Sequence, residues 1–195
     1  MTLVLATRNA HKVLEIGQIL GEKVALRSLA DFPDVGIIPE EGETFAANAA
    51  QKALFVARAL GLPAMADDSG LEVDALNGAP GVRSARFAGA QAKDGENNAK
   101  LLGLLAEVPA ERRTGRFRCA IAVARPDGSV RTAEGACEGL ILEGPRGAGG
   151  FGYDPLFVPE GYDLTFAELA GEVKNRISHR CRALRLAMET ILKGP

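Results

Sequence analysis

Several residue types that mark common protein classes are scarce in this chain. Its 195 residues include no tryptophan, two histidines and three cysteines. Two histidines far apart in the sequence are too few for a histidine-rich metal site. The cysteines, Cys119, Cys137 and Cys181, have no CxxC spacing, so we expect free thiols in a reducing compartment.

A strong charge imbalance and long apolar runs are also missing. The 23 Lys and Arg residues nearly balance the 25 Asp and Glu residues, for a formal net charge of −2 at pH 7, whereas general nucleic-acid binders are strongly basic. No apolar run approaches the roughly 20 residues of a membrane span, and the start, MTLVLATRNAHK, lacks the pattern of a secretory signal peptide. We expect a cytoplasmic protein that binds neither nucleic acid nor membrane.

The short motifs of common nucleotide-binding proteins and hydrolases are absent or out of context. The sequence has no GxxxxGK[ST], GxSxG or HExxH. GAGGFG at 147–152 satisfies GxGxxG, but Tyr-Asp-Pro and a strand-like LFV follow it where a dinucleotide-binding fold needs a helix. We interpret this segment as a turned loop whose Phe151 or Tyr153 can stack on a base. The alternative is that Phe151 belongs to the core.

What the sequence does contain is an alternation of helical and strand-like segments, followed by a long hairpin pattern. Apolar spacing and glycine stops predict the helices, and a Pro-Asp-Gly turn predicts the hairpin. We predict an α/β fold in one domain over 1–195, with a mixed central sheet, flanking helices and two lobes that enclose a cleft. Helices are expected at 11–21, 44–61, 92–108 and 177–194, and the hairpin at 117–144. A short strand is expected at the start of 3–9, further strands at 24–29 and 62–68, a short strand or β-arm at 69–76, and a strand within 144–161.

Two adjacent carboxylates end the expected strand at 62–68. Neighbouring residues of a strand point to opposite faces, so Asp67 and Asp68 need not share one site. A carboxylate at the C-terminal end of a strand in an α/β protein lies where ligands bind, and hard oxygen ligands suit Mg²⁺. The alternative is an Asx turn leading into Ser69.

A second acidic segment, PEEGETF, lies in a loop rich in proline and glycine. Glu40, Glu41 and Glu43 crowd one glycine there, which by itself is typical of a solvated loop. Together with Asp68, the segment has the ligands to complete a metal site.

Basic residues follow the first strand in TRNAHK, residues 7–12. Backbone N–H groups at a helix start, with Thr7, Asn9 and Lys12 beside them, form an anion site. The alternative is that Asn9 only caps a helix and that Lys12 is a surface residue.

Further cations lie on two later helical segments. Lys52 follows Asn48 by four residues, so both occupy one helical face. Lys174, His179 and Arg180 surround the start of the last expected helix. By themselves these groups resemble ordinary surface charge.

Five segments together resemble the inosine triphosphate pyrophosphatase family, in its order and nearly from end to end. They are LATRNAHKVLE, EEGETFAANAAQKA, ADDSGLEVDALNGAPGVRSARFAG, GGFGYDPLFVP and KNRISHR. The resemblance implies a nucleotide-binding cleft and a Mg²⁺-dependent hydrolysis of noncanonical purine nucleoside triphosphates, ITP, dITP and XTP, to the monophosphate and pyrophosphate. It also implies a homodimer.

The resemblance assigns roles to individual positions. It implies that Asp68 is the proton acceptor and that Glu40 and Asp68 bind the metal, with Glu41 as the adjacent alternative. Arg8 stands where many members have glycine. The implied substrate contacts are Thr7, Arg8, Asn9, Ala10, His11, Lys12, Lys52, Ser69, Phe151, Gly152, Tyr153, Asp154, Lys174, His179 and Arg180.

Two other functions stay open at this point. A related pyrophosphatase for pyrimidine or modified nucleotides would use the same acids with a different base pocket. A non-catalytic nucleotide sensor would bind phosphate through residues 7–12 and release no pyrophosphate.

Overall fold

The computed structural model describes residues 2–36, 38 and 40–192. Over these residues, six strands form one sheet in the order β2-β1-β3-β4-β5-β6, with both parallel and antiparallel pairs. The predicted mixed α/β fold is thereby confirmed. The chain divides into two compact units, which we call unit 1 (Met1–Asp68, Cys119–Gly135 and His179–Pro195) and unit 2 (Ser69–Arg118 and Ala136–Ser178).

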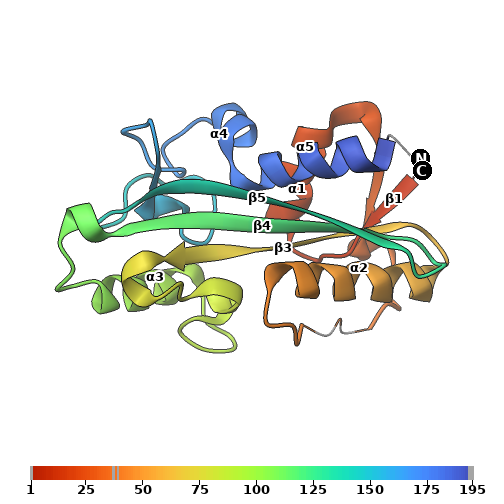
Figure 1. Ribbon diagram of the computed structural model, residues 1–195, viewed down its shortest axis with the longest axis horizontal. Coiled ribbons are helices and arrows are strands. Elements are labelled where there is room, and N and C mark those ends of the chain that lie inside the picture. Colours follow the sequence, from red (N-terminus) through yellow and green to blue (C-terminus); the bar gives the residue numbers. More distant parts are fainter. Residues whose placement is uncertain (1, 37, 39, 193–195) are drawn as a thin grey trace. The chain divides into compact units, whose positions relative to one another are not determined.

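Figure 1 shows the helices and strands along the chain and labels most of them. The strands are β1 (Thr2–Leu5), β2 (Ala25–Ser28), β3 (Ala64–Val73), β4 (Thr114–Ala124), β5 (Val130–Ile141) and β6 (Phe157–Pro159). The helices are α1 (Ala10–Leu20), α2 (Phe45–Leu60), α3 (Asp94–Leu104), α4 (Gly171–Ile177) and α5 (His179–Leu192). In the described part of the chain, no helix is long and apolar enough to cross a membrane.

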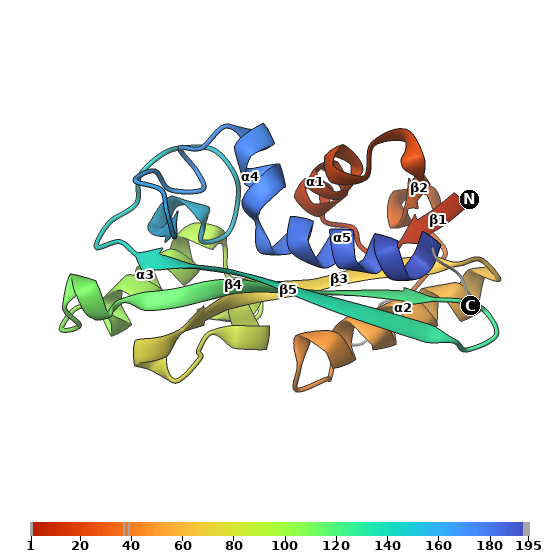
Figure 2. The ribbon, with the colours of Figure 1, turned by 45° about the horizontal axis from the view of Figure 1, so that its top comes forward.

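In unit 1, β1 lies between β2 and β3 and pairs with both in parallel. Helices α1 and α5 cover one face of the strands and α2 covers the opposite face (Figures 1 and 2). Close packing explains Gly135 on β5, because a Cβ there would lie 2.4 Å from the carbonyl oxygen of His179 on α5. The core under α1 and α5 is apolar and contains Leu3, Leu5, Ile16, Leu20, Val24, Met65, Ile121, Ala183, Leu184 and Ala187.

The ends of α1 and α2 follow local signals that are visible in the sequence. Asn9 caps α1 by accepting hydrogen bonds from the backbone N–H groups of His11 and Lys12. Thr44 caps α2 in the same way, and Gly61 ends it with a φ of 64°. A left-handed residue at this position favours glycine.

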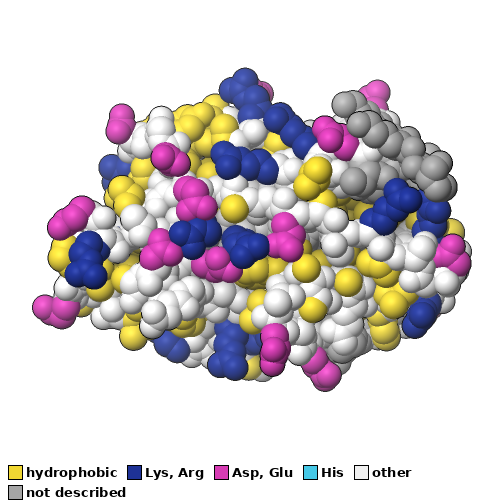
Figure 3. All heavy atoms as spheres, viewed as in Figure 1, with side chains coloured by type: hydrophobic (Ala, Val, Ile, Leu, Met, Phe, Trp, Pro, Cys, Tyr) yellow, Lys and Arg dark blue, Asp and Glu magenta, His cyan; other side chains and the backbone are white. Residues whose placement is uncertain are grey.

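In unit 2, β6 pairs antiparallel with β5, and the core contains an aromatic cluster. The Phe117 and Phe157 rings meet edge to face at 4.8 Å, and Phe166 stacks on Phe117 at 5.8 Å. At the surface of the unit, Arg116 forms ion pairs with Asp74 and Glu138. On the face shown in Figure 3, basic and acidic side chains are interspersed.

The structure differs from the sequence prediction most in β3 and α4, and the helix expected at 92–108 is shorter, Asp94–Leu104. Residues 62–68 and 69–76 were expected as separate strands, but β3 runs without a break through Asp67, Asp68, Ser69 and Gly70. The alternative of an Asx turn there is wrong, because β1 and β4 flank β3 and the pairing of strands outweighs the local preference of these residues for turns. Helix α4 was not expected, since its seven residues are too few to show a helical period.

Candidate active site

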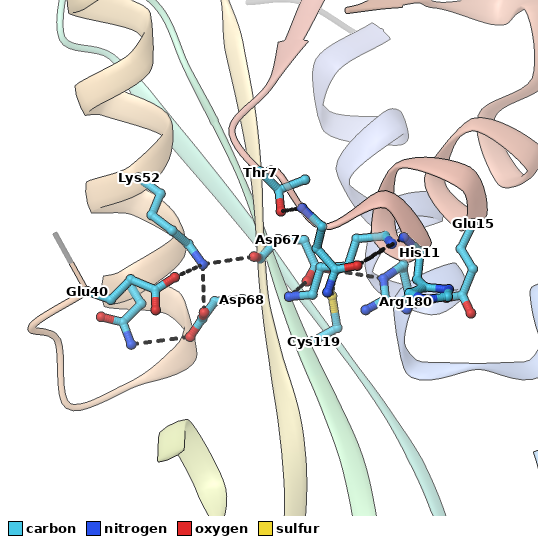
Figure 4. A network of polar contacts seen from close by, with 12 residues as sticks. Thr7, His11, Glu15, Glu40, Lys52, Asp67, Asp68, Cys119 and Arg180 are labelled. Atoms are coloured by element: carbon cyan, nitrogen blue, oxygen red, sulfur yellow. Dashed lines mark hydrogen bonds and ion pairs between the residues drawn. The ribbon is translucent and has the colours of Figure 1, made fainter. Parts of the chain in front are cut away.

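In unit 1, Lys52 of α2 connects the two acidic segments that the sequence singled out (Figure 4). Its Nζ lies 2.9 Å from Glu40 Oε1 and 2.7 Å from Asp68 Oδ1. The ammonium group also donates to the backbone oxygen of Asp67 at 3.0 Å. Burial by itself would lower the pKa of Lys52, but the carboxylates of Asp68 and Glu40 outweigh it and raise this pKa. Lys52 is therefore a buried, charged ammonium group.

The second carboxylate oxygen of Asp68 is held by Asn48, which lies one turn before Lys52 on α2. Asn48 Nδ2 donates to Asp68 Oδ2 at 3.2 Å, and Asn48 Oδ1 accepts from the backbone N–H of Gly42 at 2.7 Å. A Cβ on Gly42 would lie 2.8 Å from that oxygen, which explains the glycine within the acidic loop. Burial raises the pKa of Asp68 and Lys52 only partly opposes it, which favours Asp68 as a proton acceptor.

Asp67 has a different set of partners from Asp68, as the alternation of a strand requires. Lys12 Nζ lies 2.6 Å from Asp67 Oδ1, and Arg180 Nε donates to Asp67 Oδ2 at 2.8 Å. The Cys119 thiol donates to the same Oδ2 at 3.1 Å. Burial alone would raise the pKa of Asp67, but the charges of Arg180 and Lys12 outweigh it and hold this pKa well below its usual range.

Arg180 extends this network to α1, where its Nη1 pairs with Glu15 (Figure 4). The arginine side chain is 1% exposed. Burial would lower its pKa, but Asp67 and Glu15 outweigh this effect and raise it. Burial also raises the pKa of Cys119, and the Asp67 charge adds to this effect, so Cys119 is a neutral thiol and not an activated nucleophile.

The segment before α1 is ordered by its own side chains. Thr7 Oγ1 accepts from the backbone N–H of Asn9 at 3.1 Å, and Asn9 Oδ1 caps the helix. The capping alternative is therefore correct for Asn9, although it does not exclude a phosphate contact. Lys12 is not a free surface residue, because its ammonium group pairs with buried Asp67. Arg8 Nη2 donates to the backbone oxygen of Val35 at 2.5 Å.

In unit 2, Asp154 joins the glycine-rich loop to α4. Asp154 Oδ2 accepts from the backbone N–H of Phe151 at 2.8 Å and from Lys174 Nζ at 2.5 Å. The Lys174 ammonium group lies 5.0 Å from the centre of the Phe151 ring and 5.5 Å from that of Phe166. Lys174 and Asp154 are 5% and 3% exposed, so they form a buried ion pair beside two aromatic rings.

The same loop is held from two other sides of unit 2. The Tyr153 hydroxyl donates to the backbone oxygen of Ser84 at 2.9 Å. Gly152 N–H donates to Asp94 Oδ2 at 2.6 Å, and Asn98 Nδ2 donates to Gly152 O at 3.1 Å. Asp94 and Asn98 lie one turn apart on α3, so one helical face holds both polar groups of the Gly152 backbone.

The model of the Ham1 family matches residues 3–190. The chain belongs to the Ham1 family. This match confirms the family resemblance that the five sequence segments indicated.

Ham1 relatives and structures align with nearly the whole chain. A dITP/XTP pyrophosphatase of Desulforamulus reducens is 57% identical, covering 98% of this chain and 96% of that protein. One of Geobacter sulfurreducens is 55% identical, covering 94% and 93%. The structure of a HAM1 protein from Coxiella burnetii aligns with a TM-score of 0.89 and 39% identity over 100% of both chains.

The residues expected in a Ham1 site fall into two groups within the structure. Residues 7–12, Glu40, Lys52 and Asp68 belong to unit 1 together with His179 and Arg180, and direct contacts connect Glu40, Lys52 and Asp68. The unit 2 residues are Ser69, Phe151, Gly152, Tyr153, Asp154 and Lys174.

Sequence reasoning missed several residues that contact the candidate site residues. Asp94 and Asn98 carried no motif, and Glu15 ended the segment LATRNAHKVLE without a role assigned to it. Their partners are distant in the sequence: Glu15 pairs with a residue 165 positions away and Asp94 with one 58 positions away. Asn48 did carry a signal, its spacing of four residues from Lys52.

The donor set of unit 1 fits Mg²⁺ better than a transition metal. Within the described residues, no group of three or more His, Cys, Asp or Glu side chains is placed to hold a metal ion. Glu40 and Asp68, which share the Lys52 ammonium group, are a pair of hard oxygen donors. Mg²⁺ usually takes one or two carboxylates and completes its shell with water and phosphate oxygens.

Proposed function

We propose that this protein hydrolyses noncanonical purine nucleoside triphosphates, dITP, XTP and ITP, to the monophosphate and pyrophosphate with Mg²⁺. Relatives named dITP/XTP pyrophosphatase, 57% and 55% identical over nearly their whole lengths, support the reaction and the substrates. The observation that carries the proposal is the cluster of Glu40, Lys52 and Asp68. In this cluster the ammonium nitrogen of Lys52 lies within 2.9 Å of an oxygen of each carboxylate. The reaction would remove these nucleotides from the cellular pool.

The phosphate contacts in this proposal come from the start of α1 and from α2. Lys12 and Lys52 supply positive charge, and the first backbone N–H groups of α1 supply donors at its positive end. Thr7 and Asn9 shape this segment through their hydrogen bonds, and exposed Arg8, Ala10 and His11 border it. The ion pair with Asp67 restrains Lys12 before the substrate arrives, which lowers the entropic cost of binding.

Glu40 and Asp68 would hold the metal in this proposal. Mg²⁺ held by these two carboxylates would neutralise charge on the phosphate oxygens and increase the electrophilicity of phosphorus. Asp68 orients and deprotonates the attacking water, a role that its raised pKa favours. Asn48 fixes the rotamer of Asp68 through its hydrogen bond to Oδ2.

The base contacts in this proposal come from the loop at Phe151–Asp154 and from Lys174. The Phe151 ring stacks on the base, and Lys174 donates to the 6-keto oxygen of hypoxanthine or xanthine. The amino group of adenine would place donor against donor, and an unpaired buried polar group costs about 1–3 kcal/mol. Ser69 and His179 are further proposed substrate contacts, whereas Arg180 acts through Asp67, because its guanidinium group is buried against two carboxylates.

A direct test is pyrophosphate release measured with Mg²⁺ across ITP, XTP, dITP, GTP, ATP and dTTP. The proposal expects the three noncanonical purine nucleotides to have the highest kcat/KM. A preference for dTTP would support the related pyrimidine enzyme instead. Tight nucleotide binding without pyrophosphate release would support a sensor and overturn the proposal.

We also propose a homodimer, which rests on the family resemblance, and a cytoplasmic location, which rests on the expectation of free thiols in a reducing compartment. Light scattering on the gel-filtered protein tests the first point, since one chain has a mass of 20.5 kDa. A mass of one chain at micromolar concentration would refute the dimer. Immunofluorescence of the full-length protein in its own cells tests the second.

A further inference from the structure

Lys52 uses all of its hydrogen-bonding capacity within the acidic cluster. An ammonium group has three N–H donors, and Lys52 has three acceptors: Glu40 Oε1 at 2.9 Å, Asp68 Oδ1 at 2.7 Å and the backbone oxygen of Asp67 at 3.0 Å. The side chain is only 7% exposed. Lys52 therefore has to release at least one of these acceptors before it can donate to a phosphate.

Two of the three acceptors are the carboxylates proposed to hold the metal. A divalent ion on the same oxygens would lie a few ångströms from the ammonium group, where repulsion between like charges in a partly buried site is strong. A lysine can leave its partners by rotating its flexible four-carbon stem. A triphosphate offers the negative charge that would draw it away.

We propose that Lys52 competes with the divalent metal for Glu40 and Asp68, so that the metal binds tightly only together with the nucleotide. This inference rests on the proposed function, because it takes Glu40 and Asp68 as the metal ligands. Binding of a phosphate to Lys52 frees the two carboxylates for the metal. Binding of the metal to the carboxylates in turn releases Lys52 for the phosphate. The coupling between metal and nucleotide is therefore reciprocal.

Lys12 provides a matched control for this competition. Its ammonium group contacts Asp67 Oδ1 at 2.6 Å, whereas the side chain of Asp68 is held by Lys52 and Asn48. Removal of Lys12 thus takes one positive charge from the same unit without removing a direct contact to Asp68. A general electrostatic effect would raise the metal affinity when either lysine is replaced. Competition for the ligands raises the metal affinity only when Lys52 is replaced.

The test measures Mn²⁺ binding to the full chain without nucleotide, by electron paramagnetic resonance of free Mn²⁺ and by calorimetry. Lys52→Gln should bind Mn²⁺ at least roughly tenfold more tightly than the wild type, a change of about 1.4 kcal/mol. Lys52→Arg keeps the charge and should bind as weakly as the wild type. Lys12→Gln should change the affinity by less than about threefold, or about 0.65 kcal/mol.

Equal Mn²⁺ affinity of Lys52→Gln and the wild type would overturn the inference, as would an equal gain in Lys12→Gln. Thermal melting checks each fold, and Lys52→Met, which keeps the aliphatic stem, replaces Lys52→Gln if the latter is unfolded. The wild type supplies a measurement of its own through the ammonium signal of Lys52 in ¹⁵N-lysine NMR. This signal should persist with Mg²⁺ alone and change with Mg²⁺ plus a dITP analogue that has a methylene bridge between the α and β phosphorus atoms. A change with Mg²⁺ alone would refute the competition.

Failure of the proposed function gives a different pattern. If Glu40→Gln and Asp68→Asn bind Mn²⁺ like the wild type and the wild type releases no pyrophosphate, the metal site and the reaction are both wrong. A second pattern separates the two ideas. If the wild type is active and those two variants lose Mn²⁺ binding, the metal site and the reaction stand. If Lys52→Gln then binds Mn²⁺ no more tightly than the wild type, only the competition is wrong.

Discussion

Arg180 Nε donates to Asp67 Oδ2 at 2.8 Å, and both residues are 1% exposed. This contact joins α5 to β3 across 113 positions of the sequence. Lys12 on the other carboxylate oxygen and Glu15 on the guanidinium group extend this contact into a network of charged side chains. A network of this kind is costly to break, because each partner depends on the others for its compensating charge.

Arg180→Met should therefore destabilise the protein by about 3–5 kcal/mol, since it leaves Asp67 and Glu15 without their shared cation. Urea unfolding followed by circular dichroism gives the free energy of unfolding. Arg116→Met is the matched control, because Arg116 also pairs with several carboxylates but its side chain is 29% exposed. The control should lose less than about 1 kcal/mol, and equal losses would contradict the role of burial.

The stability of the protein should fall in acid through Asp67. Its pKa in the folded protein is well below its usual range, whereas in the unfolded chain it is about 3.9. The stabilisation by this carboxylate is therefore fully present above the unfolded pKa and is lost as the pH falls below it towards the folded pKa.

Asp67→Asn should be less stable than the wild type at neutral pH and should lose less stability between about pH 5 and pH 2. Urea unfolding at a series of pH values measures both free energies. Parallel curves for the two proteins would show that another group is responsible for the acid sensitivity.

Asp68→Asn should lower kcat by roughly a hundredfold or more, the usual contribution of a general base, while nucleotide affinity changes little. Pyrophosphate release and fluorescence titration with a nucleotide analogue separate these two effects. Asn48→Ala should have a smaller effect of the same kind, because it removes only the hydrogen bond that orients Asp68. Near-normal turnover of Asp68→Asn would exclude its proposed role.

Lys174→Met should reduce the preference for ITP over ATP by roughly tenfold, because the pocket loses its donor to the 6-keto oxygen. It should weaken phosphate binding less. The ratio of kcat/KM for the two nucleotides is the measurement. Lys100→Met is the matched control in unit 2, since the Lys100 ammonium group also lies over a ring, 4.6 Å from the centre of Phe87. An unchanged ratio in Lys174→Met would refute its place at the base.

Asp94→Ala should raise KM for dITP by roughly three- to tenfold with a smaller effect on kcat, because Gly152 N–H loses a charge-assisted hydrogen bond. Asp94→Asn should restore most of the affinity through its remaining acceptor oxygen. Glu96→Ala, in the same first turn of α3, removes only a capping interaction with Lys93. It should leave KM unchanged, and a similar rise there would mean that helix stability alone controls the loop.

Part of the site followed from spacing alone. The interval of four residues placed Asn48 and Lys52 on one face of a helix, and both contact Asp68. The alternation of a strand separated the partners of Asp67 from those of Asp68. Neither rule identified Glu15 or Asp94, since a carboxylate on a helix surface carries no sign of a partner that lies far away in the sequence.

The ends of α1 and α2 and the turn of the hairpin were already readable along the chain, because a cap or a turn is made by residues only a few positions apart. Asn9, Thr44 and Gly61 act within their own segments. The folded chain alone decided that β3 continues through Asp68 and that Lys52 binds two carboxylates 12 and 16 positions away. Such pairings depend on which segments pack together and exclude water, and no local pattern encodes that choice.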